Sequence, residues 1–416
     1  MHVIVPLAAL SVSLLLNGCH STISERSEDR VVKSSAIIFV PGFKGTALDR
    51  QDGSGRVWIT ISEAVFGTST LAWNHPPLGI PNAGELKSNG ILKSVPVIPG
   101  LFAIDVYGSW IDDLRERFSS TARIIEFSYD WRQDPLETVN ALGFLVADLQ
   151  ATGVSSITLV AHSLGGLIAS YYLRYGIQDV ETAQETWEGA RNVHKVLLLG
   201  VPFQGTMVKF RYMQEGEVVG LNHSLLDATA HSSFPASYYL LPSATEPVLL
   251  SECLGPIPNP LYQAATWREQ GWGLFQNQSP LSERDRRTRF NFVAKSLESS
   301  VKFAGLIHAP PSRFPGVRRK LVNMIGEGHA TLAQAVWMQN TIGGVAFDAT
   351  TLESAGLGGI NLTADGDGVV TTRSASLPAA FQQAFHVRTL VSKSTHEKLW
   401  LDQGVQPQLI HFLSEE

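Results

Sequence analysis

The sequence predicts an α/β fold in which a mostly parallel sheet has helices on both faces. Short apolar runs rich in β-branched residues alternate with longer segments whose apolar residues recur at helical spacing, a pattern typical of such a sheet. The chain has 416 residues, 44% hydrophobic and 17% charged, so it is long enough for one large domain with an insertion. Because the carboxyl ends of parallel strands meet at one edge, we expect the functional loops there.

Six apolar runs are the expected strands of this sheet, and they cover residues 36–40, 123–127, 157–160, 195–200, 321–325 and 387–391. The expected helices cover residues 107–118, 137–150 and 164–173, and a further helix near the end of the sequence carries His411. The sequence contains no internal repeat and no low-complexity tract.

The N-terminal segment predicts export. Val3 to Leu16 is an apolar run of the length of a secretory signal, and it ends in Leu16-Asn17-Gly18-Cys19, which resembles a bacterial lipobox, although no Lys or Arg precedes the run. We therefore expect residues 1–19 to be a lipoprotein-type signal peptide, Cys19 to be lipidated and residues 20–34 to be a polar tether. The expected location is the bacterial cell envelope, membrane-anchored through Cys19. A plain signal peptide is the alternative, and it predicts a secreted or periplasmic protein.

The charge balance and the cysteine count exclude several classes of partner. The net charge of −6 comes without a strongly basic segment, so nucleic acid is not an expected partner. If Cys19 is lipidated, Cys253 has no disulfide partner. No Cys or His spacing predicts a metal site, and no cofactor is expected. The oligomeric state leaves no mark on the sequence.

The strongest motif follows the expected strand at 157–160. Ala161-His162-Ser163-Leu164-Gly165-Gly166 places a Ser between small residues, where a tight strand-to-helix turn would lift its hydroxyl above the sheet. A Ser hydroxyl attacks esters only beside a base and an oxyanion site. An ordinary Gly-rich turn would explain the glycines but not the Ser between them. We therefore interpret Ser163 as a catalytic nucleophile.

A base and an acid should follow Ser163 in the sequence, in the order Ser, acid, His. Asp367 lies in a Gly-flanked turn after Thr363-Ala364, and it is the preferred acid over the neighbouring Asp365. A calcium loop is the alternative for this turn, but the spacing lacks the terminal Glu of a twelve-residue loop. His396 follows the last expected strand and precedes a helical segment, whereas His386 and His411 are placed less well.

Together these segments resemble the lecithin:cholesterol acyltransferase family, which includes lysosomal phospholipase A2 and bacterial lipases of the same kind. The run Tyr129-Asp130-Trp131-Arg132 is the most specific to this family. The other matching segments are the Ser163 turn, Pro99–Phe102, Ile37–Gly45, Leu199–Pro202, Asp365–Val370 and His396–Trp400. The resemblance covers roughly residues 36–206 and 320–413, and the middle of the chain matches only in patches.

The resemblance implies an α/β-hydrolase fold with a Ser163–Asp367–His396 triad. It also implies an oxyanion site made of the backbone N–H groups of Phe43 and Leu164. Because Leu164 would open a helix, its N–H has no helical partner, which agrees with this role. Three residues are expected to contact the substrate, namely Phe43, Leu101 and Trp73. The expected domains are a core at 35–206 and 320–416, a candidate lid at 57–99 and a cap insertion at 207–319.

Several side chains have two interpretations. The aromatic and leucine residues of the insertion could line an acyl channel or could be ordinary core; they are Phe234, Tyr238, Tyr239, Leu240, Leu241, Trp267, Trp272 and Phe275. The charged run 283–289 could contact lipid headgroups, but a solvated helix face is the commoner outcome. Asp130 and Arg132 are expected to form an internal ion pair, and Glu126 to be solvated.

The sequence thus predicts an exported serine acyl hydrolase acting on lipid esters through an acyl-Ser163 intermediate, and it leaves open whether an alcohol also accepts the acyl group. The alternatives are an esterase for small soluble esters and a non-catalytic lipoprotein on a hydrolase fold. The expected partners are a lipid or ester substrate and the membrane.

Overall fold

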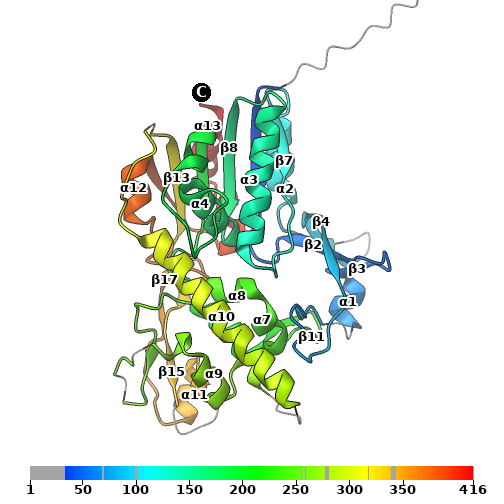
Figure 1. The fold of residues 1–416 in the computed structure, drawn as a ribbon, viewed down its shortest axis with the longest axis vertical. Helices are drawn as coiled ribbons and strands as arrows, with labels where there is room; N and C mark the ends of the chain where they lie inside the picture. Colours follow the sequence, from blue (N-terminus) through cyan, green and yellow to red (C-terminus); the bar gives the residue numbers. More distant parts are fainter. Residues whose placement is uncertain are drawn as a thin grey trace, which may run out of the picture. The chain divides into compact units, whose positions relative to one another are not determined.

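The computed structural model describes residues 33–67, 70–98, 102–253, 255–257, 259–276, 281–316, 318–338 and 343–415 (Figure 1). Its central sheet has six strands in the order β18–β13–β9–β8–β1–β7, and every neighbouring pair is parallel. The strands are β1 Ser35–Val40, β7 Ala122–Glu126, β8 Ser156–His162, β9 Lys195–Leu199, β13 Lys320–Gly326 and β18 His386–Ser392. These are the six runs expected from the sequence, with ends that differ by one or two residues, so the predicted fold class is confirmed.

Helices cover both faces of this sheet. The helices of the core are α2 Gly108–Phe118, α3 Pro135–Ala151, α4 Leu164–Tyr175, α5 Glu188–Asn192, α12 Ala379–Ala384 and α13 Gln406–Ser414, with the 3₁₀ helix η3 at His396–Leu401. The predicted helices at 107–118, 137–150 and 164–173 correspond to α2, α3 and α4. Helix α3 begins with a favourable N-terminus, because Asp134 caps it and Pro135 occupies its first turn.

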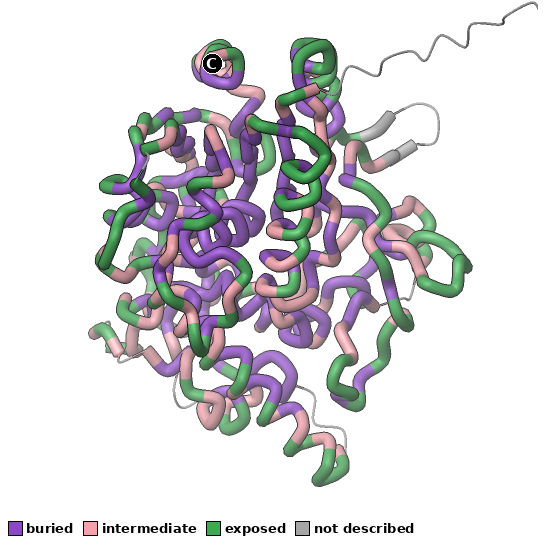
Figure 2. The backbone as a smooth tube through the Cα atoms, turned by 45° about the horizontal axis from the view of Figure 1, so that its top comes forward, coloured by how far each residue is buried: buried purple, intermediate pink, exposed green. Residues whose placement is uncertain are grey.

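The strands are continuous apolar runs in the sequence because side chains on both faces of the sheet are buried. In β1, Ile38 and Val40 belong to the core cluster that includes α3 and α4, whereas Ile37 and Phe39 belong to the cluster that includes α2 and α13. Both sets are buried because both faces of the sheet are covered. Figure 2 shows the same pattern, with buried backbone concentrated inside and exposed backbone along the surface loops.

Residues 46–105 form small antiparallel sheets beside the central one. They contain β2 Thr46–Arg50, β3 Arg56–Trp58, α1 Ile61–Val65, β4 Leu86–Ile91, β5 Ser94–Ile98 and β6 Phe102–Asp105. Strand β2 pairs with both β3 and β4, so the candidate lid at 57–99 begins inside this sheet. None of these short strands was expected from the sequence.

The predicted insertion adds no strand to the central sheet in its described part, and Figure 1 shows its helices on the side of the sheet where the strands end. Its elements are α6 Met207–Glu215, β10 Glu217–Val219, β11 Asn222–Leu226, α7 Ala228–Ser233, α8 Pro235–Tyr239, β12 Leu249–Leu250, η1 Pro260–Tyr262, α9 Ala264–Gln270, η2 Gly273–Phe275 and α10 Glu283–His308. After β13 the chain forms β14 His329–Leu332, β15 Ala335–Trp337, β16 Val345–Ala346, α11 Ala349–Ser354 and β17 Thr363–Gly366. Because β12 pairs with β15, part of the chain beyond residue 320 also packs with the insertion.

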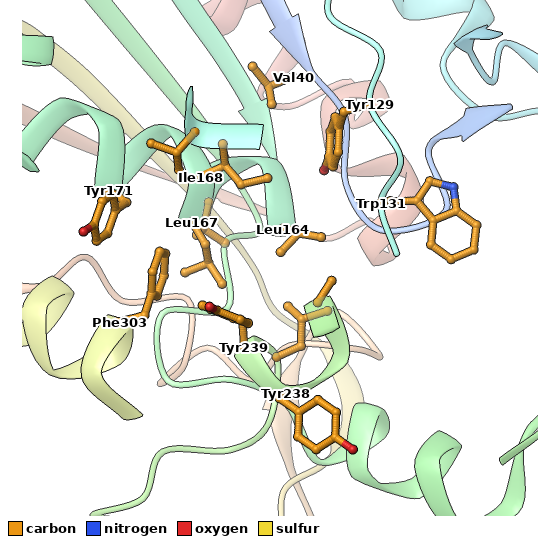
Figure 3. Packing of buried hydrophobic residues seen from close by; sticks show 14 of the residues in the cluster. Val40, Tyr129, Trp131, Leu164, Leu167, Ile168, Tyr171, Tyr238, Tyr239 and Phe303 are labelled. Atoms are coloured by element: carbon orange, nitrogen blue, oxygen red, sulfur yellow. The ribbon is translucent and has the colours of Figure 1, made fainter. Parts of the chain in front are cut away.

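Helix α4 follows β8 of the central sheet and packs against the insertion. Its side chains Leu167 and Tyr171 point toward α8 and α10, and the Tyr171 ring stacks on Phe303 at 4.9 Å between centroids (Figure 3). At its last turn the fully buried Arg174 forms a 2.8 Å ion pair with Glu185 and donates to carbonyl oxygens of α10. Because Ser163 directly precedes α4, this packing fixes the position of Ser163 relative to the insertion.

Among the residues described, no helix combines the length and the apolar character needed to cross a membrane. The predicted signal peptide, Cys19 and most of the tether lie outside the described residues.

Candidate active site

Ser163 lies on the sharp turn between β8 and α4. Its backbone angles are φ 53° and ψ −122°, in a region that residues other than Gly rarely adopt. The turn needs small neighbours, since a Cβ on Gly165 would lie 2.5 Å from the carbonyl oxygens of Val40 and Pro41. This is the strand–turn–helix geometry that the sequence motif indicated.

The structure brings Ser163, His396 and Asp367 together from three distant parts of the chain. His396 Nε2 lies 2.9 Å from Ser163 Oγ, and His396 Nδ1 lies 2.7 Å from Asp367 Oδ2. His396 is the first residue of η3, which begins four residues after the end of β18 at Ser392, and Asp367 directly follows β17. All three residues are buried, with exposed fractions of 8% for Ser163, 5% for His396 and 1% for Asp367.

The rival residues lie elsewhere. Asp365 is exposed and accepts a hydrogen bond from the Gly328 amide at 2.7 Å. His386 is exposed at the first position of β18, and His411 is exposed on α13. The turn around Asp367 therefore presents one carboxylate to an imidazole, and none of the three rivals takes part.

Burial and the ion pair oppose each other in setting the pKa values of the two ionisable groups. Burial lowers the pKa of His396, but the charge and hydrogen bond of Asp367 outweigh it and raise that pKa above 6.5. Burial raises the pKa of Asp367, but the His396 charge and hydrogen bond lower it below 3.8. The amides of Val369 and Val370 add to this, since both donate to Asp367 Oδ1. Asp367 is therefore ionised at neutral pH.

Phe43 and Leu164 both belong to segments next to Ser163. Leu164 is the first residue of α4, and Phe43 follows Gly42, where an added Cβ would lie 2.8 Å from Ser163 Cβ. Within the described residues, neither amide donates a hydrogen bond to another protein atom. Two unpartnered N–H groups beside a nucleophilic oxygen are the components of an oxyanion site.

A cavity of about 260 Å³ opens at Ser163 and His396. Its wall is mainly apolar. Phe43 comes from the loop between β1 and β2, Trp58 from the candidate lid and Leu240 from the insertion. Such a cavity fits an acyl chain better than a polar ligand.

The predicted substrate contacts have different outcomes. Phe43 lines the cavity. Trp73 does not: its indole lies over the Arg132 guanidinium at 5.2 Å, and its backbone N–H donates to Ser233 Oγ. A guanidinium stacks well on an indole face, which explains this position. Leu101 lies outside the described residues.

The aromatic and leucine residues of the insertion are buried core, and of the eight only Leu240 lines the cavity. For the other seven, the acyl-channel interpretation gives way to core packing. Phe234, for example, packs edge-on against Trp131 at 5.7 Å between centroids.

The expectation for Asp130 and Arg132 was right and the expectation for Glu126 was wrong, while the run 283–289 stays open between its two interpretations. Asp130 and Arg132 form a buried ion pair at 2.6 Å. Most of the run 283–289 is partly or fully exposed at the start of α10, but Arg289 is buried and donates to the carbonyl oxygens of Leu78, Gly79 and Leu274. Glu126 is not solvated, because its side chain is only 17% exposed and pairs with Lys93 and Arg115.

Sequence reasoning missed two lysines in the cavity wall, Lys44 and Lys209, and the ionisable side chains that contact them. Lys44 pairs with Glu217 at 2.6 Å, and Lys209 Nζ lies 3.4 Å from the centre of the Phe43 ring. Burial and the nearby Lys44 lower the pKa of Lys209 well below 10.5, while burial and Lys209 lower that of His231 to about 3. Lys44 lies within the recognised segment Ile37–Gly45, but its neighbours Lys209, Glu217 and His231 carry no sequence pattern that marks them.

A model of the family described as lecithin:cholesterol acyltransferase matches residues 54–302. The chain belongs to the lecithin:cholesterol acyltransferase family. The match includes Ser163 and much of the insertion, which the sequence motifs matched only in patches, and it ends before Asp367 and His396. No curated protein sequence matches the chain.

Comparison with solved structures gives one alignment that supports the fold of this family member. A chain of the Tle4–Tli4 complex aligns with a TM-score of 0.57 at 13% identity, covering 92% of this chain and 98% of that one. The mature form of the Bacillus licheniformis lipase BlEst2 aligns with a TM-score of 0.34 at 12% identity, covering 92% and 93%. The first likeness supports the α/β-hydrolase fold; at so low an identity it supports the fold alone.

Within the described residues, no group of three or more His, Cys, Asp or Glu side chains is arranged to hold a metal ion.

Proposed function

We propose that this protein is a serine acyl hydrolase that acts on lipid esters through an acyl-Ser163 intermediate. The observation that carries the proposal is the chain of hydrogen bonds from Ser163 to His396 to Asp367 at a cavity whose wall is mainly apolar. Membership of the lecithin:cholesterol acyltransferase family supports acyl transfer as the reaction class and lipids as the substrates.

The geometry supports a two-step reaction. His396 Nε2 takes the proton from Ser163 Oγ as that oxygen attacks the ester carbonyl carbon, and Asp367 stabilises the imidazolium. The amides of Phe43 and Leu164 hydrogen-bond the oxyanion. The carbon–oxygen bond to the leaving alcohol then breaks, and His396 returns its proton to that alcohol, which leaves the acyl group on Ser163.

The second step has two possible acceptors. Water, or the hydroxyl of an alcohol, loses a proton to His396 as it attacks the acyl carbon, and Ser163 recovers its proton from His396 when the new product leaves. When water is the acceptor the product is a fatty acid, and when an alcohol is the acceptor the product is a new ester. Hydrolysis is the proposed main reaction, with transfer to a lipophilic alcohol beside it.

Export and anchoring are part of the proposal. The N-terminal apolar run and its lipobox-like end support a lipoprotein whose Cys19 anchors it to a bacterial membrane, with a secreted or periplasmic protein as the alternative. A lipid anchor agrees with a lipid substrate, because it keeps the enzyme close to membranes.

The test compares full-length wild-type protein with Ser163→Ala on two substrate sets. The first is a series of p-nitrophenyl esters from acetate to palmitate, and the second is phospholipid vesicles containing a lipophilic alcohol, with fatty acid and acylated alcohol both quantified. We expect wild type alone to release products, with faster turnover of long-chain and vesicle substrates, because the cavity wall is apolar.

Other outcomes separate the parts of the proposal. A preference for acetate over palmitate, without activity on vesicles, would contradict the lipid assignment and leave a soluble-ester hydrolase. Equal product from both proteins, or none from either, would contradict catalysis by Ser163 and favour a binding lipoprotein.

A further inference from the structure

His162, the residue before Ser163, is bonded at both ring nitrogens beneath the site. Its Nδ1 lies 2.7 Å from the Tyr107 hydroxyl oxygen, and its Nε2 lies 3.1 Å from the backbone carbonyl oxygen of His396. The residue is 4% exposed, and Trp400 packs edge-on against its ring at 5.0 Å between centroids. The proposed reaction uses neither His162 nor Tyr107, so these contacts need another explanation.

The partners determine where the protons lie. A carbonyl oxygen only accepts, so Nε2 of His162 carries a proton and donates to His396. Burial, followed by the charge of nearby His396, lowers the pKa of His162 well below 6.5, so its ring is neutral and Nδ1 is an acceptor. Tyr107 therefore donates its hydroxyl proton to Nδ1. Burial raises the pKa of Tyr107 above 10, so that proton is retained at neutral pH.

The chain of hydrogen bonds continues to the proposed oxyanion site. The Gly42 amide donates to the Tyr107 hydroxyl oxygen at 3.1 Å. Gly42 directly precedes Phe43, and a Cβ on Gly42 would lie 3.0 Å from His162 Nδ1. One continuous path thus joins the Gly42–Phe43 turn, Tyr107, His162 and the His396 backbone.

We propose that Tyr107 and His162 are positioning residues, which hold the Phe43 amide and the His396 imidazole at fixed places relative to Ser163. This inference rests on the proposed function. The two parts that they connect are a turn after β1 and the first residue of the short 3₁₀ helix η3, and neither belongs to a strand or an α-helix. Catalytic groups on loops need such support, because small displacements of a donor or a base strongly slow the reaction.

The variant Tyr107→Phe removes one oxygen and retains the ring that stacks on Trp400. It leaves the Gly42 amide without its acceptor and His162 Nδ1 without its donor. We expect kcat to fall by about 10- to 100-fold with KM nearly unchanged, because the loss acts on groups that bind the transition state. The variant His162→Leu should behave similarly. His162→Gln should recover most of the activity, because an amide offers one acceptor and one donor in place of the two ring nitrogens.

The experiment measures kcat, KM and inhibition by a long-chain trifluoromethyl ketone, whose adduct with Ser163 carries an oxyanion. Wild type and Ser163→Ala are measured first, and an inactive wild type would contradict the proposed function and this inference with it. The matched control is Tyr171→Phe, which removes another buried tyrosine hydroxyl, bonded to the Gln178 carbonyl oxygen at 2.9 Å outside the cavity wall. Thermal unfolding is recorded for every variant.

We expect Tyr107→Phe to lower the affinity for the ketone by the same factor as it lowers kcat. Tyr171→Phe should leave kcat and ketone affinity unchanged, although it loses a similar amount of thermal stability. Positioning is overturned if Tyr107→Phe retains wild-type kcat and ketone affinity. It is also overturned if Tyr171→Phe lowers kcat as much, or if His162→Gln is no more active than His162→Leu, since those results would indicate a general effect on stability.

Discussion

Replacing Ser163 by Ala is expected to remove nearly all ester hydrolysis, with kcat lower by about 10⁴- to 10⁶-fold. Ala lacks the oxygen that forms the acyl intermediate, while the amides of Phe43 and Leu164 remain and sustain only a small residual rate. The fold should persist, because Ser163 Oγ makes one hydrogen bond in the structure, to His396. Steady-state turnover of a long-chain p-nitrophenyl ester measures the loss, and thermal unfolding checks the fold.

Ser170→Ala is the matched control for this experiment. Ser170 lies on α4 two turns after Ser163, is fully buried and lies outside the cavity wall. We expect it to retain wild-type turnover. If Ser163→Ala retains more than a tenth of the wild-type rate, another residue is the nucleophile.

The second large effect is expected for Asp367→Asn, which should lower kcat by about 10⁴-fold. An amide at this position no longer stabilises an imidazolium, and its N–H₂ can donate to His396 Nδ1. The ring then carries its proton on Nε2, where it cannot accept the proton of Ser163. The measurement is kcat for the same ester, at several pH values.

The pH dependence should change in a defined direction. In the wild type the pKa of His396 is raised, so the neutral imidazole is lost as pH falls through a value above 6.5, and kcat/KM should fall there. Without the Asp367 charge, burial is the main remaining influence, and it lowers that pKa. The acid limb of kcat/KM should therefore move to lower pH in Asp367→Asn.

Asp365→Asn tests the choice between the two carboxylates of this turn. Asp365 is exposed and contacts the Gly328 amide instead of His396. Its replacement should change kcat by less than about threefold, as is usual for surface positions. A larger loss for Asp365→Asn than for Asp367→Asn would contradict the assignment of the acid.

The central sheet could be predicted because strands covered on both faces leave continuous apolar runs in the sequence. The short antiparallel strands could not. Strand β4, for example, has the sequence Leu-Lys-Ser-Asn-Gly-Ile, in which polar residues and a Gly hide the strand. Its pairing with β2 depends on tertiary contacts that local periodicity does not record.

The same distinction applies to the site. Ser163, Asp367 and His396 could be predicted because each lies in a local motif at the end of a strand. The position of Trp73 could not, since it depends on the Arg132 guanidinium more than fifty residues later in the sequence. Lys209 reaches the cavity wall, and Glu217 reaches Lys44, only through the packing of the insertion, which no sequence spacing reveals.

The most direct test of the account is to find the modified residue after reaction with a lipid-like fluorophosphonate. Full-length wild-type protein is incubated with the reagent, digested and analysed by peptide mass spectrometry. We predict one phosphonylated residue, Ser163, with fluoride lost, and no adduct in Ser163→Ala. An adduct on a different residue, or none on the folded wild-type protein, would contradict the proposal that Ser163 carries the acyl group.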